Sequence, residues 1–193
     1  MARPREFDEA RALEKAMNAF WERGYNGTSV TDLIAATGLN KGSLYGAFGD
    51  KRTLFLKAVV HFRQRGLEVM REVLEQPGSA KEAIAEWMAL VAKGCCADDG
   101  WRGCFVFNTA VEMAPHDREI AEWVRQVMQR SQQMFRAALE RGQARGEFSS
   151  RLDCEAAAGF LVVSVAGLRV ICKTSPKQKE IRGVVDLILS VLD

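Results

Sequence analysis

The sequence predicts an all-α protein of about nine helices, because helical spacing of apolar residues recurs along the whole chain. In successive segments an apolar residue returns every three or four positions, which places these residues on one face of a helix. Between the segments stand residues that begin or end helices, such as Asn40, Gly49-Asp50 and Pro77-Gly78. With 193 residues, 48% of them hydrophobic, the chain can bury a sizeable core.

The charge balance excludes a general polycation, since the formal net charge is only +2. Residues 1–73 carry 12 Lys and Arg against 9 Asp and Glu, whereas residues 74–193 carry 15 against 16. A modest positive excess at the N-terminal end fits a local phosphate-binding face. An N-terminal arm with Arg3 and Arg5 can lie near DNA or remain a solvated terminus; both readings are open.

The N-terminus and the cysteines indicate a reduced, cytoplasmic compartment. The first ten residues are charged and lack the apolar core of a secretory signal. The five cysteines are an odd number, so their thiols are expected to be free. The longest apolar run, Ala156 to Leu168, is too short to span a membrane, and no membrane partner is expected.

The first three helices are short and lie close together in the sequence. The first is expected from Asp8 to Gly24, and two more lie between Ser29 and Gly49. Gly38 can take the positive φ that ends the second helix, and Asn40 can cap the third. A short helix, a tight turn and a helix that starts with basic and hydroxyl groups are typical of a helix-turn-helix DNA reader.

Polar side chains at the starts of these helices are the candidate DNA contacts. Hydroxyl groups and lysines can bind phosphates, and Lys41 can also reach a guanine edge. Asn40 is expected to cap its helix first, and the small pair Gly46-Ala47 leaves few side chains for base readout. The candidate DNA-binding residues are Thr28, Thr31, Asn40, Lys41, Ser43, Tyr45 and Lys51.

The stretch GYNGTSVTDLIAATGLNKGSLYGAFGDKRTLF, from Gly24 to Phe55, closely resembles the DNA-binding domain of TetR/AcrR-type transcriptional regulators. The resemblance implies a three-helix DNA-binding domain, residues 1–52, with a long connecting helix from about residue 51. Residues 53–193 would form a larger helical domain for effector binding and dimerisation. The implied function is a sequence-specific regulator, a repressor that leaves double-stranded operator DNA when a small molecule of unknown identity binds.

Six further helical segments follow from the patterns of apolar residues and breakers. Trp101–Met113 can be a short helix or a pair of turns, and Pro176 suits a first helical turn. The expected segments are Lys51–Glu75, Ser79–Cys96, Trp101–Met113, Asp117–Gly142, Asp153–Cys172 and Pro176–Leu192.

An apolar effector pocket between the fourth and seventh helices is implied by the resemblance. Its aromatic and Met-rich walls would suit an apolar ligand, although a packed core without ligand explains the same residues. The candidates are Phe62, Trp87, Met88, Val91, Cys95, Cys104, Phe105, Asn108, Trp123, Val127 and Met128.

The last two helices are the expected homodimer interface. The eighth is apolar almost all round from Ala156 to Ile171, with Arg169 its one charge, so it needs cover on both sides. A monomer with a central helix is the alternative. The interface candidates are Phe160, Val163, Ser164, Gly167, Ile171, Ile181, Val184, Val185 and Ile188.

The sequence carries no motif of an enzyme and none for a cofactor. His61 and His116 are isolated, and no metal site is expected. A thiol-based redox, electrophile or metal sensor that acts through the same DNA reader is the alternative function. In that case Arg102 and a helix start would lower the pKa of Cys104, with Cys95 and Cys96 nearby.

Overall fold

A computed structural model describes residues 7–192, and this part of the chain is helical without strands. The expected all-α class with about nine helices is confirmed. The N-terminal arm with Arg3 and Arg5 lies outside the described residues. The elements are α1 (Glu9–Arg23), α2 (Val30–Thr37), α3 (Lys41–Phe48), α4 (Lys51–Glu75), α5 (Ala80–Cys95), η1 (Gly100–Arg102), α6 (Phe105–Met113), α7 (Arg118–Ala144), α8 (Cys154–Ile171), η2 (Cys172–Thr174) and α9 (Gln178–Ser190).

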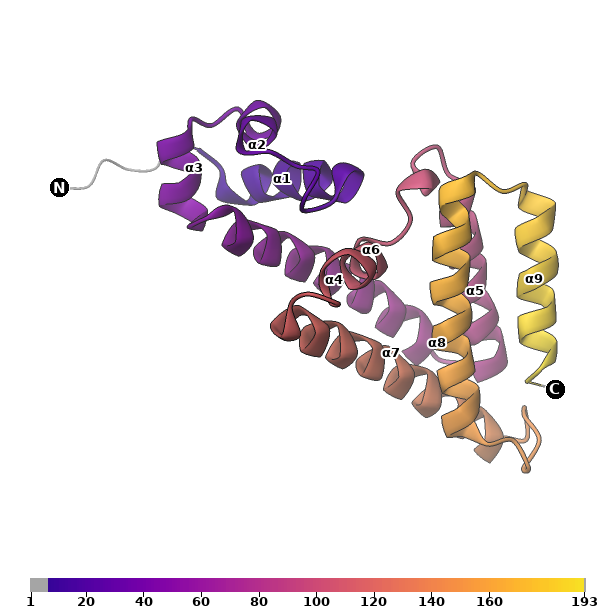
Figure 1. The fold of residues 1–193 in the computed structure, drawn as a ribbon. Coiled ribbons are helices and arrows are strands. Elements are labelled where there is room, and N and C mark those ends of the chain that lie inside the picture. Colours follow the sequence, from indigo (N-terminus) through magenta and orange to yellow (C-terminus); the bar gives the residue numbers. More distant parts are fainter. Residues whose placement is uncertain (1–6, 193) are drawn as a thin grey trace.

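The helices form two packed groups that share α4. Figure 1 shows α1–α3 at one end of the molecule and α8 with α9 at the opposite end, with α4 running from one group toward the other. One apolar core joins α1–α4 with Phe105, Ile120 and Val124 from α6 and α7. The other joins the end of α4 with α5, α7, α8 and α9.

Side-chain caps set the helix starts where the sequence predicts them. Asp8, Asn40, Asp50 and Asp117 each accept hydrogen bonds from backbone N–H groups of the turn that follows. Gly38 closes α2 in the left-handed region, at φ 75°, which a residue without Cβ adopts at little cost. The boundaries of the first four helices therefore follow from local chemistry.

Two predicted segments differ in detail. The sixth divides into η1 and α6, because Gly103 adopts φ 67° and breaks the helix between them. The ninth helix begins at Gln178, after Lys177 as N-cap, so Pro176 precedes the helix instead of entering its first turn. These differences shift boundaries and leave the order of elements unchanged.

The prediction of five free thiols is wrong for one pair. Cys95, at the end of α5, forms a disulfide with Cys172 of η2, and their Cα atoms are 4.7 Å apart. The two cysteines are separated by 77 residues, so their spacing in the sequence gave no sign of the bond. The disulfide links the C-terminal end of α5 to the turn that follows α8, and both of these helices pack against α9.

The helix that contains the Ala156–Leu168 run is longer than the run itself. Residues Cys154–Thr174 are long and apolar enough for a membrane span by length and composition alone. In the structure α8 packs along α7 and α5, with Ala158 and Leu161 fully buried. A core helix of a helical domain has the same composition, so this helix does not indicate a membrane protein.

Candidate DNA-reading surface and effector pocket

The helix-turn-helix is built on a small apolar centre. Phe20 of α1, Leu33 of α2, and Leu44 and Phe48 of α3 are buried together, which fixes α3 against α1 and α4. The polar starts of α2 and α3 remain outside this core. The arrangement is that of a reader helix held by two supporting helices.

The predicted DNA contacts fall into two groups by exposure. Thr31 and Lys41 are exposed, while Ser43 and Tyr45 are half-buried, with Tyr45 packed against the apolar core. The side chain of Asn40 is occupied, because its Oδ1 accepts the N–H of Ser43 at 2.9 Å.

Thr28 requires a correction. Its side chain is fully buried, and its hydroxyl donates to the carbonyl oxygen of Gly24 at 2.6 Å. Ser29, the next residue, is the exposed N-cap of α2, where it forms a capping box with Asp32. Thr28 therefore stabilises the loop between α1 and α2 and cannot offer its hydroxyl to a phosphate.

The two basic residues at the start of α4, Lys51 and Arg52, have different partners. The ammonium group of Lys51 lies 4.4 Å from the ring centre of Tyr25, while Arg52 donates to Asp117 at 2.9 Å and to Glu119 at 2.7 Å. The hydrogen bond from Arg52 holds the pKa of Asp117 below its usual value. Arg52 thus ties the start of α4 to the start of α7, so a phosphate contact is not its role here.

A second link joins the loop after α1 to the end of α6. The two carboxylate oxygens of Glu112 accept the backbone N–H groups of Tyr25 and Asn26, at 2.9 and 2.8 Å. Gly24 lies directly beneath, where a Cβ would come within 2.6 Å of Oε2. These charge-assisted hydrogen bonds therefore fix the position of the helix-turn-helix unit relative to α6.

Glu112→Ala is expected to lower the free energy of unfolding by about 1–3 kcal/mol, because two backbone donors lose their partner. Urea denaturation measures this loss. Glu122→Ala, which removes a carboxylate paired with Arg125 on the surface of α7, is the matched control and should change stability by about 0.5 kcal/mol or less. Equal losses for the two variants would contradict the structural role of Glu112.

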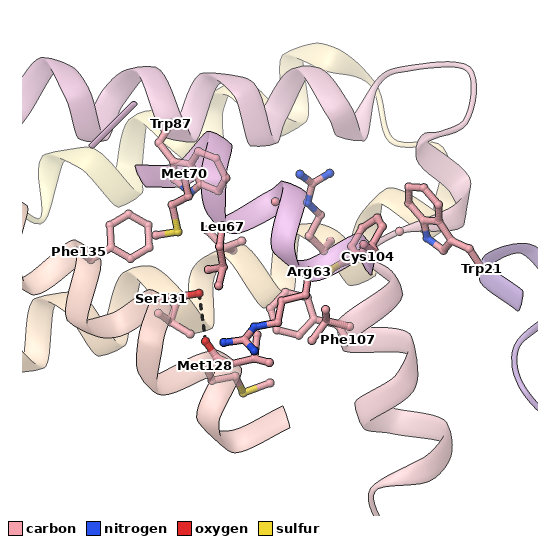
Figure 2. Close-up of a pocket in the computed structure, with 18 residues that line it drawn as sticks. Trp21, Arg63, Leu67, Met70, Trp87, Cys104, Phe107, Met128, Ser131 and Phe135 are labelled. Carbon is pink, nitrogen blue, oxygen red and sulfur yellow. Dashed lines mark hydrogen bonds between the residues drawn. The ribbon is translucent and has the colours of Figure 1, made fainter. Parts of the chain in front are cut away.

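An apolar cavity of about 230 Å³ lies between α4, α6, α7 and α8. Figure 2 shows aromatic and Met side chains around it, with Ser131 turned back to the carbonyl oxygen of Val127 at 3.3 Å. The lining residues are Trp21, Phe62, Arg63, Gly66, Leu67, Met70, Trp87, Gly103, Cys104, Val106, Phe107, Val127, Met128, Ser131, Phe135, Val162, Val165 and Arg169.

The structure brings five of the predicted pocket residues together at this cavity: Phe62, Trp87, Cys104, Val127 and Met128. The remaining six predictions need correction. Their side chains are used in the core, in surface contacts or in the disulfide, as the following placements show. Met88, Val91 and Phe105 are core residues, Cys95 is disulfide-bonded, Asn108 donates to the carbonyl of Arg102, and Trp123 packs beside Arg63.

Sequence reasoning missed residues that reach the cavity from outside the expected helix pair. Trp21 comes from α1, and Val162, Val165 and Arg169 come from α8. Arg169 is the one charge in the apolar run from Ala156 to Ile171, and this pattern could have identified it, whereas Arg63 stands among other polar residues of α4 and gave no such signal.

The thiol of Cys104 differs from the expectation. Burial raises the pKa of Cys104, against a smaller lowering by its hydrogen bonds and by Arg169. The guanidinium of Arg102 is engaged elsewhere, since it lies 4.1 Å from the ring centre of Trp21 and donates to Asn18 and Asp99. Cys104 is therefore held as a neutral thiol, whereas a reactive cysteine needs a lowered pKa. Within residues 7–192 no group of three His, Cys, Asp or Glu could hold a metal ion.

The predicted interface residues fall on two different faces. Phe160, Val163, Ile171 and Val184 are exposed apolar side chains, Gly167 is exposed, and Ser164 is half-buried. Ile181, Val185 and Ile188 require correction, because they are 2–6% exposed and pack into the core of their own chain. The outward stripe of α9 consists of Val184 and Leu187, and it continues to Val191, the C-cap of the helix.

Comparison with known proteins agrees with this geometry at both ends of the chain. Residues 12–58 match the model of bacterial regulatory proteins of the tetR family, and residues 81–186 match that of the tetracyclin repressor-like C-terminal domain. An uncharacterised HTH-type transcriptional regulator of Bacillus subtilis, YezE, is 35% identical over the full length of both chains. The Escherichia coli repressor ComR is 30% identical over 87% of this chain and 80% of its own.

A solved structure extends the likeness to the fold. The TetR family regulator CifR, in a cysteine-substituted form complexed with a 26-bp double-stranded operator DNA, has a TM-score of 0.90 and 32% identity, and both chains are covered completely. Family models, relatives of full length and a structural neighbour thus agree with the helix-turn-helix described above. The chain belongs to the TetR family of DNA-binding transcriptional regulators.

Proposed function

We propose that this protein is a repressor that binds a two-fold symmetric operator as a homodimer and leaves it when a small molecule fills the cavity. The observation that carries the proposal is the position of Trp21, a residue of α1 that forms part of the cavity wall. A ligand there touches the helix-turn-helix unit and α4, α6, α7 and α8 at once. We propose no catalytic role, and the protein would act in the cytoplasm.

The contacts around the cavity give the ligand a route to the DNA reader. Arg102 stacks on the ring of Trp21 and donates a hydrogen bond to Asn18. Glu112 accepts a hydrogen bond from the loop after α1, and Arg52 pairs with Asp117 and so connects the starts of α4 and α7. A ligand that changes the spacing of α4, α6 and α7 therefore changes the position of α1 and the reader. It shifts the equilibrium only by its different affinities for the two states.

The domain division proposed is residues 1–52 for DNA binding and 53–193 for effector binding and dimerisation. The support is that α3 ends at Phe48 and that α4, which takes part in both apolar cores, begins at Lys51. Thr31, Lys41, Ser43, Tyr45 and Lys51 remain the proposed DNA contacts, with Asn40 as the cap of α3. The proposed dimer face combines the exposed apolar stripes of α8 and α9.

Binding-site selection with the full chain tests the DNA-binding function, and the expected product is a sequence with two-fold symmetry. On that operator, Lys41→Ala is expected to weaken binding about tenfold and to reduce the slope of log affinity against log salt by about one. Lys179→Ala, an exposed lysine of α9, is the control and should leave both unchanged. An unchanged salt slope for Lys41→Ala, with relaxed specificity at one base pair, would instead assign Lys41 to a guanine edge.

The thiol-sensing alternative is less favoured by the same geometry. Cys104 is half-buried and burial raises its pKa, and Cys95 forms a disulfide with Cys172. Operator release by an oxidant that is abolished in Cys104→Ser would restore the alternative.

A further inference from the structure

The charges that line the cavity are both positive. Of its 18 lining residues, only Arg63 and Arg169 carry a charge, and neither Asp nor Glu is among these described residues. The other walls are aromatic, aliphatic, Met, Cys, Gly and Ser side chains. Arg63 and Arg169 are both half-buried, and a charge that is partly removed from water is normally paired, so cations without a carboxylate are unusual in an apolar cavity.

Arg63 is the less satisfied of the two. Its Nε is buried and has no hydrogen-bond partner among residues 7–192, and no ion pair of its guanidinium is found there. Its nearest favourable contact is the ring of Trp123, with the guanidinium carbon 5.9 Å from the ring centre. Burial lowers the pKa of Arg63, and the positive charge of Arg130 lowers it further. The protein therefore keeps a cation in a position where water is partly removed and no anion from residues 7–192 pairs with it.

Arg169 brings a second positive charge from α8. Its guanidinium lies against α5, where a Cβ on Gly94 would come within 2.9 Å of Nη1. It borders the cavity and also the exposed groove between α1, α4 and α5. The small residue at 94 leaves room for the guanidinium at the boundary of both spaces.

We propose that the effector of this pocket is an organic anion, a carboxylate on a small apolar body, whose head group pairs with Arg63. A planar guanidinium matches a carboxylate through two parallel hydrogen bonds, and the match is strongest where water is excluded. The apolar body would lie against Trp87, Phe107 and Met128. A cavity of about 230 Å³ lies below the range of about 300–1,000 Å³ usual for drug-sized ligands, which selects a smaller molecule. The proposal rests on the proposed function, since it names the ligand class of the same cavity.

Isothermal titration calorimetry of the full chain tests the charge preference directly. The probes are octanoate and 3-phenylpropanoate, each compared with its neutral amide, and octylamine as the cationic analogue. At least one carboxylate is expected to bind at least about tenfold more tightly than its amide, and octylamine is expected not to bind. Failure of both carboxylates to bind at millimolar concentration, or equal binding of acid and amide, overturns the proposal.

The variant Arg63→Met separates a binding residue from a structural one. It should abolish the preference for the carboxylate and leave the weak affinity for the amide. The thermal midpoint of the unliganded variant should be unchanged or higher, because a half-buried, unpaired charge has been removed. Arg130→Met removes a neighbouring positive charge that does not line the cavity, so it controls for long-range electrostatics. Retention of the preference in Arg63→Met, or its equal loss in Arg130→Met, contradicts the assignment.

Operator binding is measured separately in the same samples. If the carboxylate binds through Arg63 but does not release the operator, the ligand class stands and the proposed coupling to DNA fails. If a neutral molecule releases the operator while no carboxylate binds, the repressor function stands and the ligand class fails.

Discussion

Replacing Phe55 by alanine is expected to lower the free energy of unfolding by about 3–5 kcal/mol. The side chain of Phe55 is 1% exposed and lies on α4, in the core that joins α1–α4 to α6 and α7. Its ring contacts three others, with centre distances of 5.1 Å to Phe20, 5.0 Å to Tyr25 and 5.6 Å to Phe105. The first two belong to the DNA-reading end and the third to α6. Alanine would therefore open a cavity at the junction and remove three edge-to-face contacts.

Urea denaturation of the full chain measures the loss, and two variants control it. Phe55→Leu keeps much of the buried volume and should lose less than half as much. Val111→Ala changes a side chain of α6 that is 75% exposed and should shift stability by about 0.5 kcal/mol or less. A Phe55→Ala loss as small as that of Val111→Ala would show that the aromatic cluster does not hold the two ends together.

The helices were predictable because their boundaries depend on neighbours in the sequence. Asp8, Asn40, Asp50 and Asp117 act on the turn that they precede, so a local reading identifies them as caps. The helix-turn-helix is likewise contained in about 20 consecutive residues. Fold class and reader were therefore accessible from the sequence.

Loop geometry and contacts between distant residues account for the errors. Thr28 looks like a helix-start hydroxyl, but its loop turns it back onto Gly24. The ion pairs of Arg52 were not predicted, because the fold brings Asp117 and Glu119 to it from 65 or more residues away. The disulfide of Cys95 and Cys172 depends on the same kind of proximity. The sequence shows which polar side chains are present, whereas the partner that each one bonds depends on how the helices and loops pack.

The pocket and the dimer face were only partly predictable, because one helix can bury two apolar stripes against different partners. In α9 the stripe with Ile181, Val185 and Ile188 packs on its own chain, and the stripe with Val184, Leu187 and Val191 points outward. Both stripes have helical spacing, so the sequence cannot say which faces inward. Trp21 of α1 likewise has two environments, since it packs against the core of the reader and also lines the cavity.

A double substitution of the outward stripes, Val163→Glu with Leu187→Glu, is expected to convert the protein into a monomer. The two side chains are 70% and 68% exposed in the single chain and lie on α8 and α9, at the end of the molecule remote from α3 (Figure 1). In the proposed two-fold dimer each substitution occurs in both chains, so four carboxylates would be buried in the interface without a cation to pair with. The free energy of burying these charges would exceed what the apolar contacts of the interface supply. The two DNA-reading units of a dimer bind one operator together, so dissociation into monomers should weaken operator binding by about 10²–10⁴-fold.

Light scattering and operator titration measure the two effects, and the matched control is Val69→Glu with Leu90→Glu. These are the same two residue types, exposed on α4 and α5 beside a groove that is separate from the proposed dimer face. The control should remain dimeric and keep its operator affinity.

The stability of the α8–α9 variant should be retained, since Val163 and Leu187 contribute little to the core of the single chain. A dimeric α8–α9 variant, or dissociation of the control instead, would move the interface to another face. Dissociation with full operator affinity would mean that a single reader suffices, which contradicts the two-fold operator.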